Sequence, residues 1–137
     1  MRQGSTQRIY VATRFEMWRT ALDVHEALRL VGHEPTSRWV GIAKSLDGQC
    51  DAVSSPGERR SNAQMDLKDI ARSDVLLVLV PTEGGTGMWV ELGYAYALGK
   101  RIHCVGPAKA RTIFAELPGI KHHDVPLSAL AAIGEGL

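Results

Sequence analysis

The sequence predicts an α/β protein, a Rossmann-like (flavodoxin-like) three-layer sandwich with a mostly parallel sheet of four to five strands. Segments with strand character alternate with segments of helical periodicity, which indicates βαβ units. Residues 75–80 are apolar without alternation, as expected for a strand covered on both faces. A glycine-rich turn follows this strand and precedes a helix. In such folds, ligands bind at the carboxyl ends of the strands.

The composition fits one globular domain spanning residues 1–137. Sixteen basic and fifteen acidic side chains leave a net charge of +1, which gives no electrostatic footprint for a nucleic-acid polymer or a membrane surface. Cys50 and Cys104 lack metal-ligand spacing, and the histidines are scattered, so we expect no metal site. The polar start of the chain has no apolar h-region, and we therefore expect a cytoplasmic protein without a signal peptide.

The first part of the chain predicts two strands and one helix. Residues 8–13 are rich in β-branched and aromatic side chains, as in a strand. Apolar residues recur at helical spacing over 15–31, and Gly32 follows as a C-cap. We expect a second strand over 34–39. Residues 40–54 have no clear period, so we expect a loop there, with room for one helical turn, that acts as a mobile cover of a site.

The second part continues the alternation. Ser55-Pro56-Gly57-Glu58 has the form of a capping box with proline at N1, and it predicts a helix that runs to about Ser73. Right-handed crossovers then place helices on both faces of the sheet. The remaining expected elements are strands over 74–81, 101–105 and 120–125 and helices over 88–98, 110–117 and 127–133.

Glu91 is the single charged side chain between Met88 and Leu98. An ionised carboxylate on an otherwise apolar helix is costly unless it is paired or kept for chemistry. The glycines just before this helix let a ligand approach the backbone closely. We therefore expect Glu91 in a functional site. The alternative is a buried structural carboxylate held by backbone N–H groups.

Asp66 is the carboxylate that we expect to join Glu91. Four residues define the expected buried face of its helix: Ala63, Leu67, Ile70 and Ala71. Asp66 falls at the edge of this face, whereas Asp69 points toward water and is interpreted as a solvated charge. Asp74 begins a strand at its amino end, which is the wrong end for the site. The alternative for Asp66 is an ordinary acid on a helix surface.

With these residues placed, the chain resembles the nucleoside 2-deoxyribosyltransferase family, which also contains nucleoside 5′-monophosphate N-glycosidases. The resemblance extends from Ile9 to about Gly106. Three stretches carry it: Met65-Asp66-Leu67-Lys68-Asp69-Ile70, Ser73-Asp74-Val75 and Gly87-Met88-Trp89-Val90-Glu91-Leu92-Gly93-Tyr94-Ala95. The family pattern is an Asp-Leu pair, a strand start, a glycine-rich turn and a Glu-Leu-Gly-x-Ala helix in this order. Ser73 departs from it, since the family has a small apolar residue there.

The resemblance implies a retaining displacement at C1′ of a nucleoside, without a cofactor. Glu91 would be the nucleophile that forms a covalent glycosyl-enzyme, and Asp66 would deliver or remove a proton at the leaving base. The expected activity is transfer of the 2-deoxyribosyl group to another free nucleobase. Hydrolysis of a nucleoside 5′-monophosphate is the alternative. A homodimer or larger homo-oligomer is expected by resemblance and because helix 88–98 is apolar nearly all round.

Residues at and just after the carboxyl ends of three of the expected strands are the candidates for substrate binding: Ala12, Thr13, Arg14, Trp39, Gly84, Gly85, Thr86, Gly87 and Met88. Arg14 is a candidate for contact with a phosphate or base, or else a surface arginine. Trp39 is a candidate for stacking on a nucleobase, or else for core packing. Thr86 only loosely matches the serine of family members that prefer 5′-monophosphates. The tail 131–137 matches none of the C-terminal residues that neighbouring subunits supply in family transferases.

Two other functions stay open. Gly85-x-Gly87 is part of a dinucleotide-binding fingerprint, but Val90 stands where the third glycine belongs, and no acidic residue follows about twenty positions on. A non-catalytic domain that binds or senses a nucleotide is the second alternative. Glu91→Gln separates it from an enzyme, because a sensor would keep its binding and a glycosidase would lose turnover.

Overall fold

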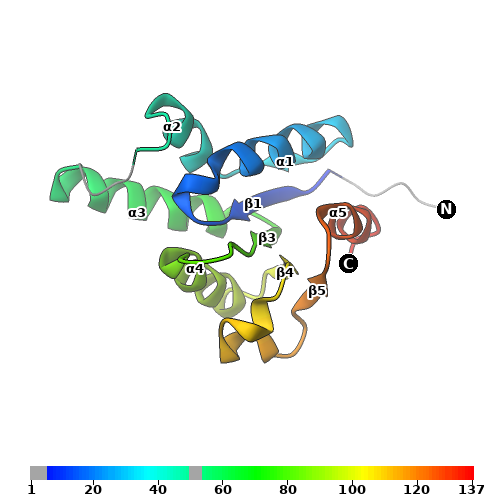
Figure 1. Cartoon of the computed structure of the whole chain (residues 1–137). Helices are drawn as coiled ribbons and strands as arrows, with labels where there is room; N and C mark the ends of the chain where they lie inside the picture. Colours follow the sequence, from blue (N-terminus) through cyan, green and yellow to red (C-terminus); the bar gives the residue numbers. More distant parts are fainter. Residues whose placement is uncertain (1–5, 50–53) are drawn as a thin grey trace.

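The computed structural model describes residues 6–49 and 54–137 (Figure 1). The described residues form a five-stranded sheet with the order β2-β1-β3-β4-β5, and every neighbouring pair is parallel. The strands are β1 (Arg8–Ala12), β2 (Glu34–Pro35), β3 (Val75–Leu79), β4 (Arg101–Val105) and β5 (Lys121–His123). This is the flavodoxin-like order, and it confirms the predicted α/β class and parallel sheet.

Helices cover both faces of this sheet (Figure 1). They are α1 (Trp18–Leu30), α2 (Trp39–Ser45), α3 (Pro56–Ala71), α4 (Thr86–Ala97) and α5 (Pro126–Gly134), with short 3-10 turns η1 (Phe15–Met17), η3 (Ala108–Ala110) and η4 (Ile113–Glu116). Right-handed crossovers place α3 and α4 together on one face and α1 and α5 on the other. The central strands β1 and β3 are buried along nearly their whole length, so the core lies between these two helical layers.

The capping box at the start of α3 is confirmed. The Ser55 hydroxyl accepts a hydrogen bond from the Glu58 backbone N–H, and the Glu58 carboxylate accepts one from the Ser55 N–H, both at 3.1 Å. Because two exposed N–H groups are satisfied locally, the sequence pattern alone sets where this helix begins.

The second strand is shorter than predicted. It spans Glu34–Pro35, and the expected strand over 34–39 is wrong beyond that point. The Ser37 hydroxyl accepts a hydrogen bond from the Val11 N–H at 3.0 Å and lies 2.7 Å from Nε2 of His25. Burial lowers the pKa of His25 to about 4, so the imidazole in this contact is neutral at pH 7. The Ser37 side chain thus takes the place of a backbone carbonyl as the partner of the Val11 N–H, and the chain leaves the sheet after Pro35.

Residues 40–54 contain more structure than the expected loop. Helix α2 runs over Trp39–Ser45, so Trp39 begins a helix instead of ending a strand. Residues 50–53 of the expected cover, including Cys50, lie outside the described residues.

The helix expected over 110–117 consists of the two short turns η3 and η4. Thr112 separates them, and its side chain accepts a hydrogen bond from the Phe114 N–H. Helix α4 begins at Thr86, two residues earlier than expected, because Gly85 adopts a left-handed conformation at its N-cap.

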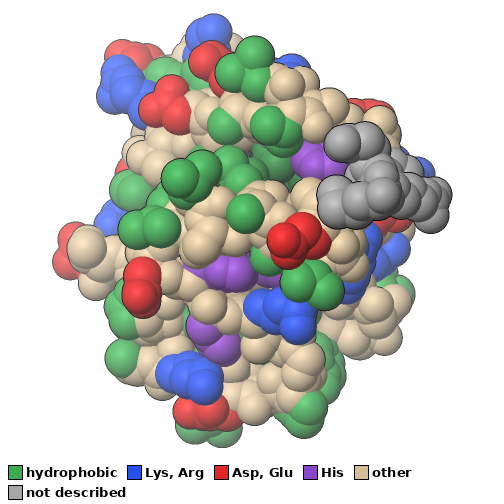
Figure 2. All heavy atoms as spheres, turned by 90° about the vertical axis from the view of Figure 1, so that its right-hand side faces the viewer, with side chains coloured by type: hydrophobic (Ala, Val, Ile, Leu, Met, Phe, Trp, Pro, Cys, Tyr) green, Lys and Arg blue, Asp and Glu red, His purple; other side chains and the backbone are tan. Residues whose placement is uncertain are grey.

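The outer face formed by α1 and α5 carries an apolar groove of about 490 Å³. Figure 2 shows hydrophobic side chains gathered on this side of the molecule. Leu30 and Leu127, from the two helices, are 87% and 74% exposed there. None of the helices in the described part of the chain is long and apolar enough to cross a membrane.

Candidate active site

A cavity of about 260 Å³ lies where the carboxyl ends of β1 and β3 meet the start of α4. Glu91 and Asp66 both line it, from α4 and α3 respectively. Most of the predicted substrate-binding residues line it too: Thr13, Arg14, Trp39, Gly85, Thr86, Gly87 and Met88. Ala12 does not, because it is fully buried in β1, and Gly84 lies just outside on the exposed part of the turn.

Glu91 is held by a buried tyrosine. The Tyr10 hydroxyl donates a hydrogen bond of 2.5 Å to Oε2 of Glu91. Burial raises the pKa of Glu91 to about 8, the negative charge of Asp66 adds to this rise, and the Tyr10 hydrogen bond opposes it. Glu91 therefore holds a proton at neutral pH.

The pattern of residues 8–13 predicts a strand and does not single out Tyr10 as a site residue. Its side chain is 0% exposed in the centre of β1. Burial, followed by the charge of Glu91, raises the pKa of Tyr10 well above its usual value, so the phenol remains a donor. A signal existed, because a tyrosine in a strand covered on both faces needs a partner for its hydroxyl.

Asp66 lies on the side of α3 that faces the cavity. It is partly buried, and its charge raises the pKa of both Glu91 and Tyr10. The structure therefore brings the two predicted carboxylates into one electrostatic unit. Two acids in such proximity favour a shared proton over two charges.

The interpretation of Asp69 as a solvated charge is wrong. Its carboxylate is 0% exposed and forms ion pairs with Arg38, at 2.8 Å, and with Arg72, at 3.1 Å. The Arg38 backbone N–H also donates to it. Since these partners pull Asp69 inward, the buried face of α3 is rotated from the predicted one, and Ala63 and Ala71 are exposed.

This ion-pair cluster connects the start of α2 to α3. Trp39, the residue after Arg38, is thereby held over the cavity, and its indole N–H donates to the Val11 carbonyl at 2.9 Å. The Trp39 and Phe15 rings lie 6.2 Å apart between centroids. Trp39 thus belongs both to the core and to an aromatic wall suited to the face of a nucleobase.

The glycine turn before α4 requires its glycines. Gly84 and Gly85 have φ values of +72° and +88°. A Cβ on Gly85 would lie 3.1 Å from the Pro81 ring and 3.2 Å from the end of Met88, so a side chain would be both strained and crowded. Because these two glycines have no side chains, a ligand in the cavity can approach the backbone at the start of α4 closely.

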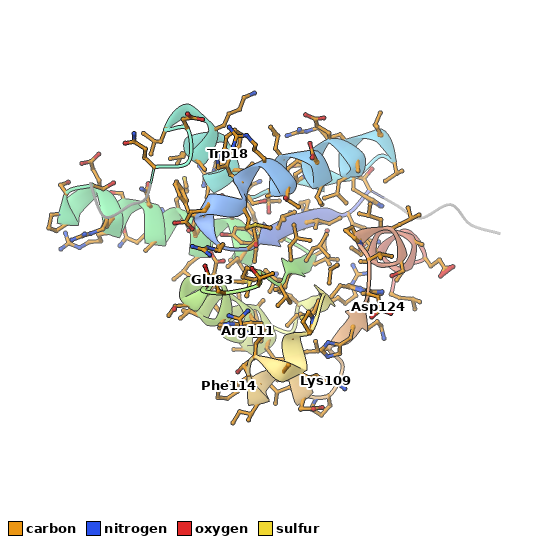
Figure 3. The ribbon with its side chains drawn as sticks, in the orientation of Figure 1. Trp18, Glu83, Lys109, Arg111, Phe114 and Asp124 are labelled. Atoms are coloured by element: carbon orange, nitrogen blue, oxygen red, sulfur yellow. The ribbon has the colours of Figure 1, made fainter. Side chains whose placement is uncertain are left out.

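Two arginines form hydrogen bonds with backbone carbonyls of this turn. Arg111 donates to the Pro81 carbonyl at 2.5 Å and to the Gly84 carbonyl at 2.7 Å, and Arg14 donates to the Glu83 carbonyl at 3.4 Å. Figure 3 shows Arg111 extending from the segment after β4 toward the turn with Glu83. The sequence contained no local signal for this contact, since Arg111 follows the turn by more than twenty residues.

The N-terminus of α4 is suited to an anion. No side chain caps it, and the cavity-lining Thr86, Gly87 and Met88 belong to its first turn. Free N–H groups and the helix dipole favour negative charge there. The guanidinium of Arg14 lies next to Gly84 on the same side, where it also forms ion pairs with Glu16, at 3.1 Å, and with Glu83, at 3.7 Å. Among the described residues, no group of three or more His, Cys, Asp or Glu side chains could hold a metal ion.

Comparison with known proteins finds a matching family and a similar solved structure. Residues 9–127 match the model of the family described as Nucleoside 2-deoxyribosyltransferase. No curated protein matches the chain. Among solved structures, the chain is similar to one described as the CMP N-glycosidase BcmB of Clostridium botulinum, with 17% identity and a TM-score of 0.55 over 93% of this chain and 98% of that chain. At this identity, the likeness shows a shared fold.

Proposed function

Because this chain belongs to the nucleoside 2-deoxyribosyltransferase family of enzymes, we propose that it cleaves the N-glycosidic bond of a nucleoside or nucleotide through Glu91. The observation that carries the proposal is the arrangement of Tyr10, Glu91 and Asp66 at one cavity. Tyr10 binds one carboxylate oxygen of Glu91, which leaves the other for C1′. The transition state at C1′ is oxocarbenium-like, and a buried carboxylate stabilises its positive charge.

The first step moves one proton as well as the sugar. An oxygen of Glu91 forms a bond to C1′, the C1′–N bond breaks, and its electron pair goes to the base nitrogen. The proton that Glu91 held passes through the Asp66 carboxylate to the leaving base. In the second step an acceptor attacks C1′, the electron pair of the ester bond returns to Glu91, and the acceptor's proton returns to the carboxyl pair.

Transfer of a 2-deoxyribosyl group to a second nucleobase is the activity that family membership favours. Hydrolysis of a nucleoside 5′-monophosphate is a second candidate, and the uncapped start of α4 beside Arg14 favours it, because these groups suit a phosphate. The two activities differ only in whether a base or water attacks the glycosyl-enzyme. A non-catalytic nucleotide sensor is the remaining alternative.

One assay separates these functions. The protein is incubated with each deoxynucleoside and each deoxynucleoside 5′-monophosphate, with and without an acceptor base, and free base and new nucleoside are followed by chromatography. A transferase forms new nucleoside only with an acceptor, whereas a hydrolase releases base without one. Glu91→Gln should abolish turnover and keep binding. Release of no base from any substrate, or full activity of Glu91→Ala, would overturn the proposal.

We also propose a homo-oligomer. Val90 on α4 and Leu98 just after it are 66% and 46% exposed, and Ile113 and Phe114 are 79% and 58% exposed. Exposed apolar side chains of this size favour contact with another chain. A cytoplasmic location stays a prediction from the sequence.

A further inference from the structure

Asn62 lies one helical turn before Asp66 on α3 and lines the same cavity. Residues four apart share a face of a helix, and their positions differ by about 6 Å along its axis. The Asn62 side chain is partly buried at the cavity. A neutral group with both a donor and an acceptor therefore stands beside the proposed acid.

Asn62 is at the end of the cavity where a base would lie. Asn62 and Ile42 also line a shallower hollow between α2 and α3, whereas Arg14 and Thr86 mark the α4 end of the cavity. If the sugar C1′ meets Glu91 and any phosphate meets the start of α4, the base extends toward the α2–α3 end. The aromatic wall of Trp39 contributes to the same side of the cavity.

The chemistry of the leaving base decides what Asn62 would meet there. In a purine, the ring nitrogen N7 that accepts a proton lies next to the amino or keto group on C6. In a pyrimidine, N3 lies next to the corresponding group on C4. A side chain next to the proton donor therefore faces the exocyclic group that distinguishes amino bases from keto bases.

We propose that Asn62 hydrogen-bonds to this exocyclic amino or keto group and so takes part in base selection. The proposal rests on the proposed N-glycosidic cleavage. The amide can turn its carbonyl to an amino base or its NH₂ to a keto base. A carboxylate at this position only accepts hydrogen bonds, and it would favour amino bases.

The test compares wild type, Asn62→Asp and Asn62→Leu, with Gln64→Leu as the control because Gln64 is an exposed amide on the same helix. The substrates are deoxyadenosine, deoxyinosine and the analogue with hydrogen on C6, or their 5′-monophosphates; the matching pyrimidine series applies if purines are not released. Asn62→Asp should raise the amino-to-keto ratio of kcat/KM about tenfold, which corresponds to about 1.4 kcal/mol and lies within the usual cost of an unpaired or repelled group. Asn62→Leu should lower kcat/KM for the two substituted substrates and leave the unsubstituted one unchanged.

Equal losses for all three substrates in both variants would overturn the role of Asn62. If wild type releases no base at all, the proposed function fails, and this proposal is then decided by calorimetric binding of adenine and hypoxanthine. A changed ratio of the two affinities in Asn62→Asp supports it, and an unchanged ratio overturns it. The melting temperature of each variant, compared with that of Gln64→Leu, shows whether the variant is folded.

Discussion

Glu91 and Tyr10 together set the charge state of the site. Burial of Glu91 favours its neutral form, and the Tyr10 hydroxyl favours the ionised form. The result is a carboxyl group that holds a proton at pH 7 and can release it when positive charge develops at C1′. Such a balance is typical of groups that act in catalysis.

This balance predicts a loss of activity at alkaline pH. The pair of Glu91 and Asp66 must carry one proton for the leaving base, and burial raises the pKa of Glu91 to about 8. Since the proton is retained below this pH and lost above it, kcat/KM should fall about tenfold per pH unit above pH 8. Base release measured from pH 6 to pH 10 tests this. A rate that keeps rising over that range would contradict the proposed path of the proton.

Tyr10→Phe should lower kcat by about 10- to 100-fold, because a hydrogen bond to a charged group contributes about 1.5–3 kcal/mol. The hydrogen bond also lowers the pKa of Glu91, so the alkaline loss of activity should move to higher pH in the variant. Tyr94→Phe is the control, since Tyr94 is a partly buried tyrosine on α4 that does not line the cavity. If Tyr10→Phe lowers the melting temperature but keeps the pH profile, the tyrosine is only structural.

Helices α2 and α3 are joined by a charge cluster instead of apolar contacts alone. Asp69 is the centre of this cluster, with Arg38 from the start of α2 and Arg72 from the end of α3. Arg72 also donates to the Thr36 carbonyl, just after β2. The cluster therefore holds together the two helices from which Trp39 and Asp66 line one cavity.

Asp69→Asn should reduce the free energy of unfolding by about 1–3 kcal/mol. The variant leaves two arginines without their buried partner, although both are partly exposed to solvent, which limits the cost. Urea denaturation measures the effect, and Asp23→Asn on the exposed side of α1 is the matched control. A change of less than about 0.5 kcal/mol, as is usual for surface sites, would show that the cluster does not hold these helices.

Exposed apolar side chains of the described residues occur at two places in the whole molecule. Val90 on α4 and Ile113 and Phe114 on η4 are exposed, and the groove between α1 and α5 exposes others (Figure 2). The sequence-based expectation of an oligomer rests on α4, so its surface is the predicted interface.

Val90→Glu should therefore shift an oligomer toward monomer, because it places a charge on the exposed side of α4. Sedimentation velocity over a range of concentrations measures the change, with Leu30→Glu on the α1–α5 groove as the control. Dissociation by Leu30→Glu alone would move the interface to the groove. A wild-type protein that stays monomeric at all concentrations would show that the expectation of an oligomer is wrong.

Features that depend on neighbouring residues could be predicted from the sequence. The alternation of strands and helices gives the α/β class, the capping box gives the start of α3, and the family resemblance is confirmed by the match over residues 9–127. Glu91 stood out because one charge interrupts an apolar helix. The structure places it at the same cavity as Asp66. Local hydrogen bonds and the helical period are properties of short segments, so short segments suffice to predict them.

Only the tertiary structure decided which distant groups meet. Tyr10 becomes the partner of Glu91, although 81 residues separate them. Ser37 ends β2 by bonding to β1, and Arg38 draws Asp69 inward and rotates the buried face of α3. These outcomes depend on desolvation and on long-range partners, which compete with periodicity and override it when a buried polar group must be satisfied. The sequence by itself thus determined the class of fold and pointed to two carboxylates that line one cavity, and the folded chain determined how Glu91 is held and charged.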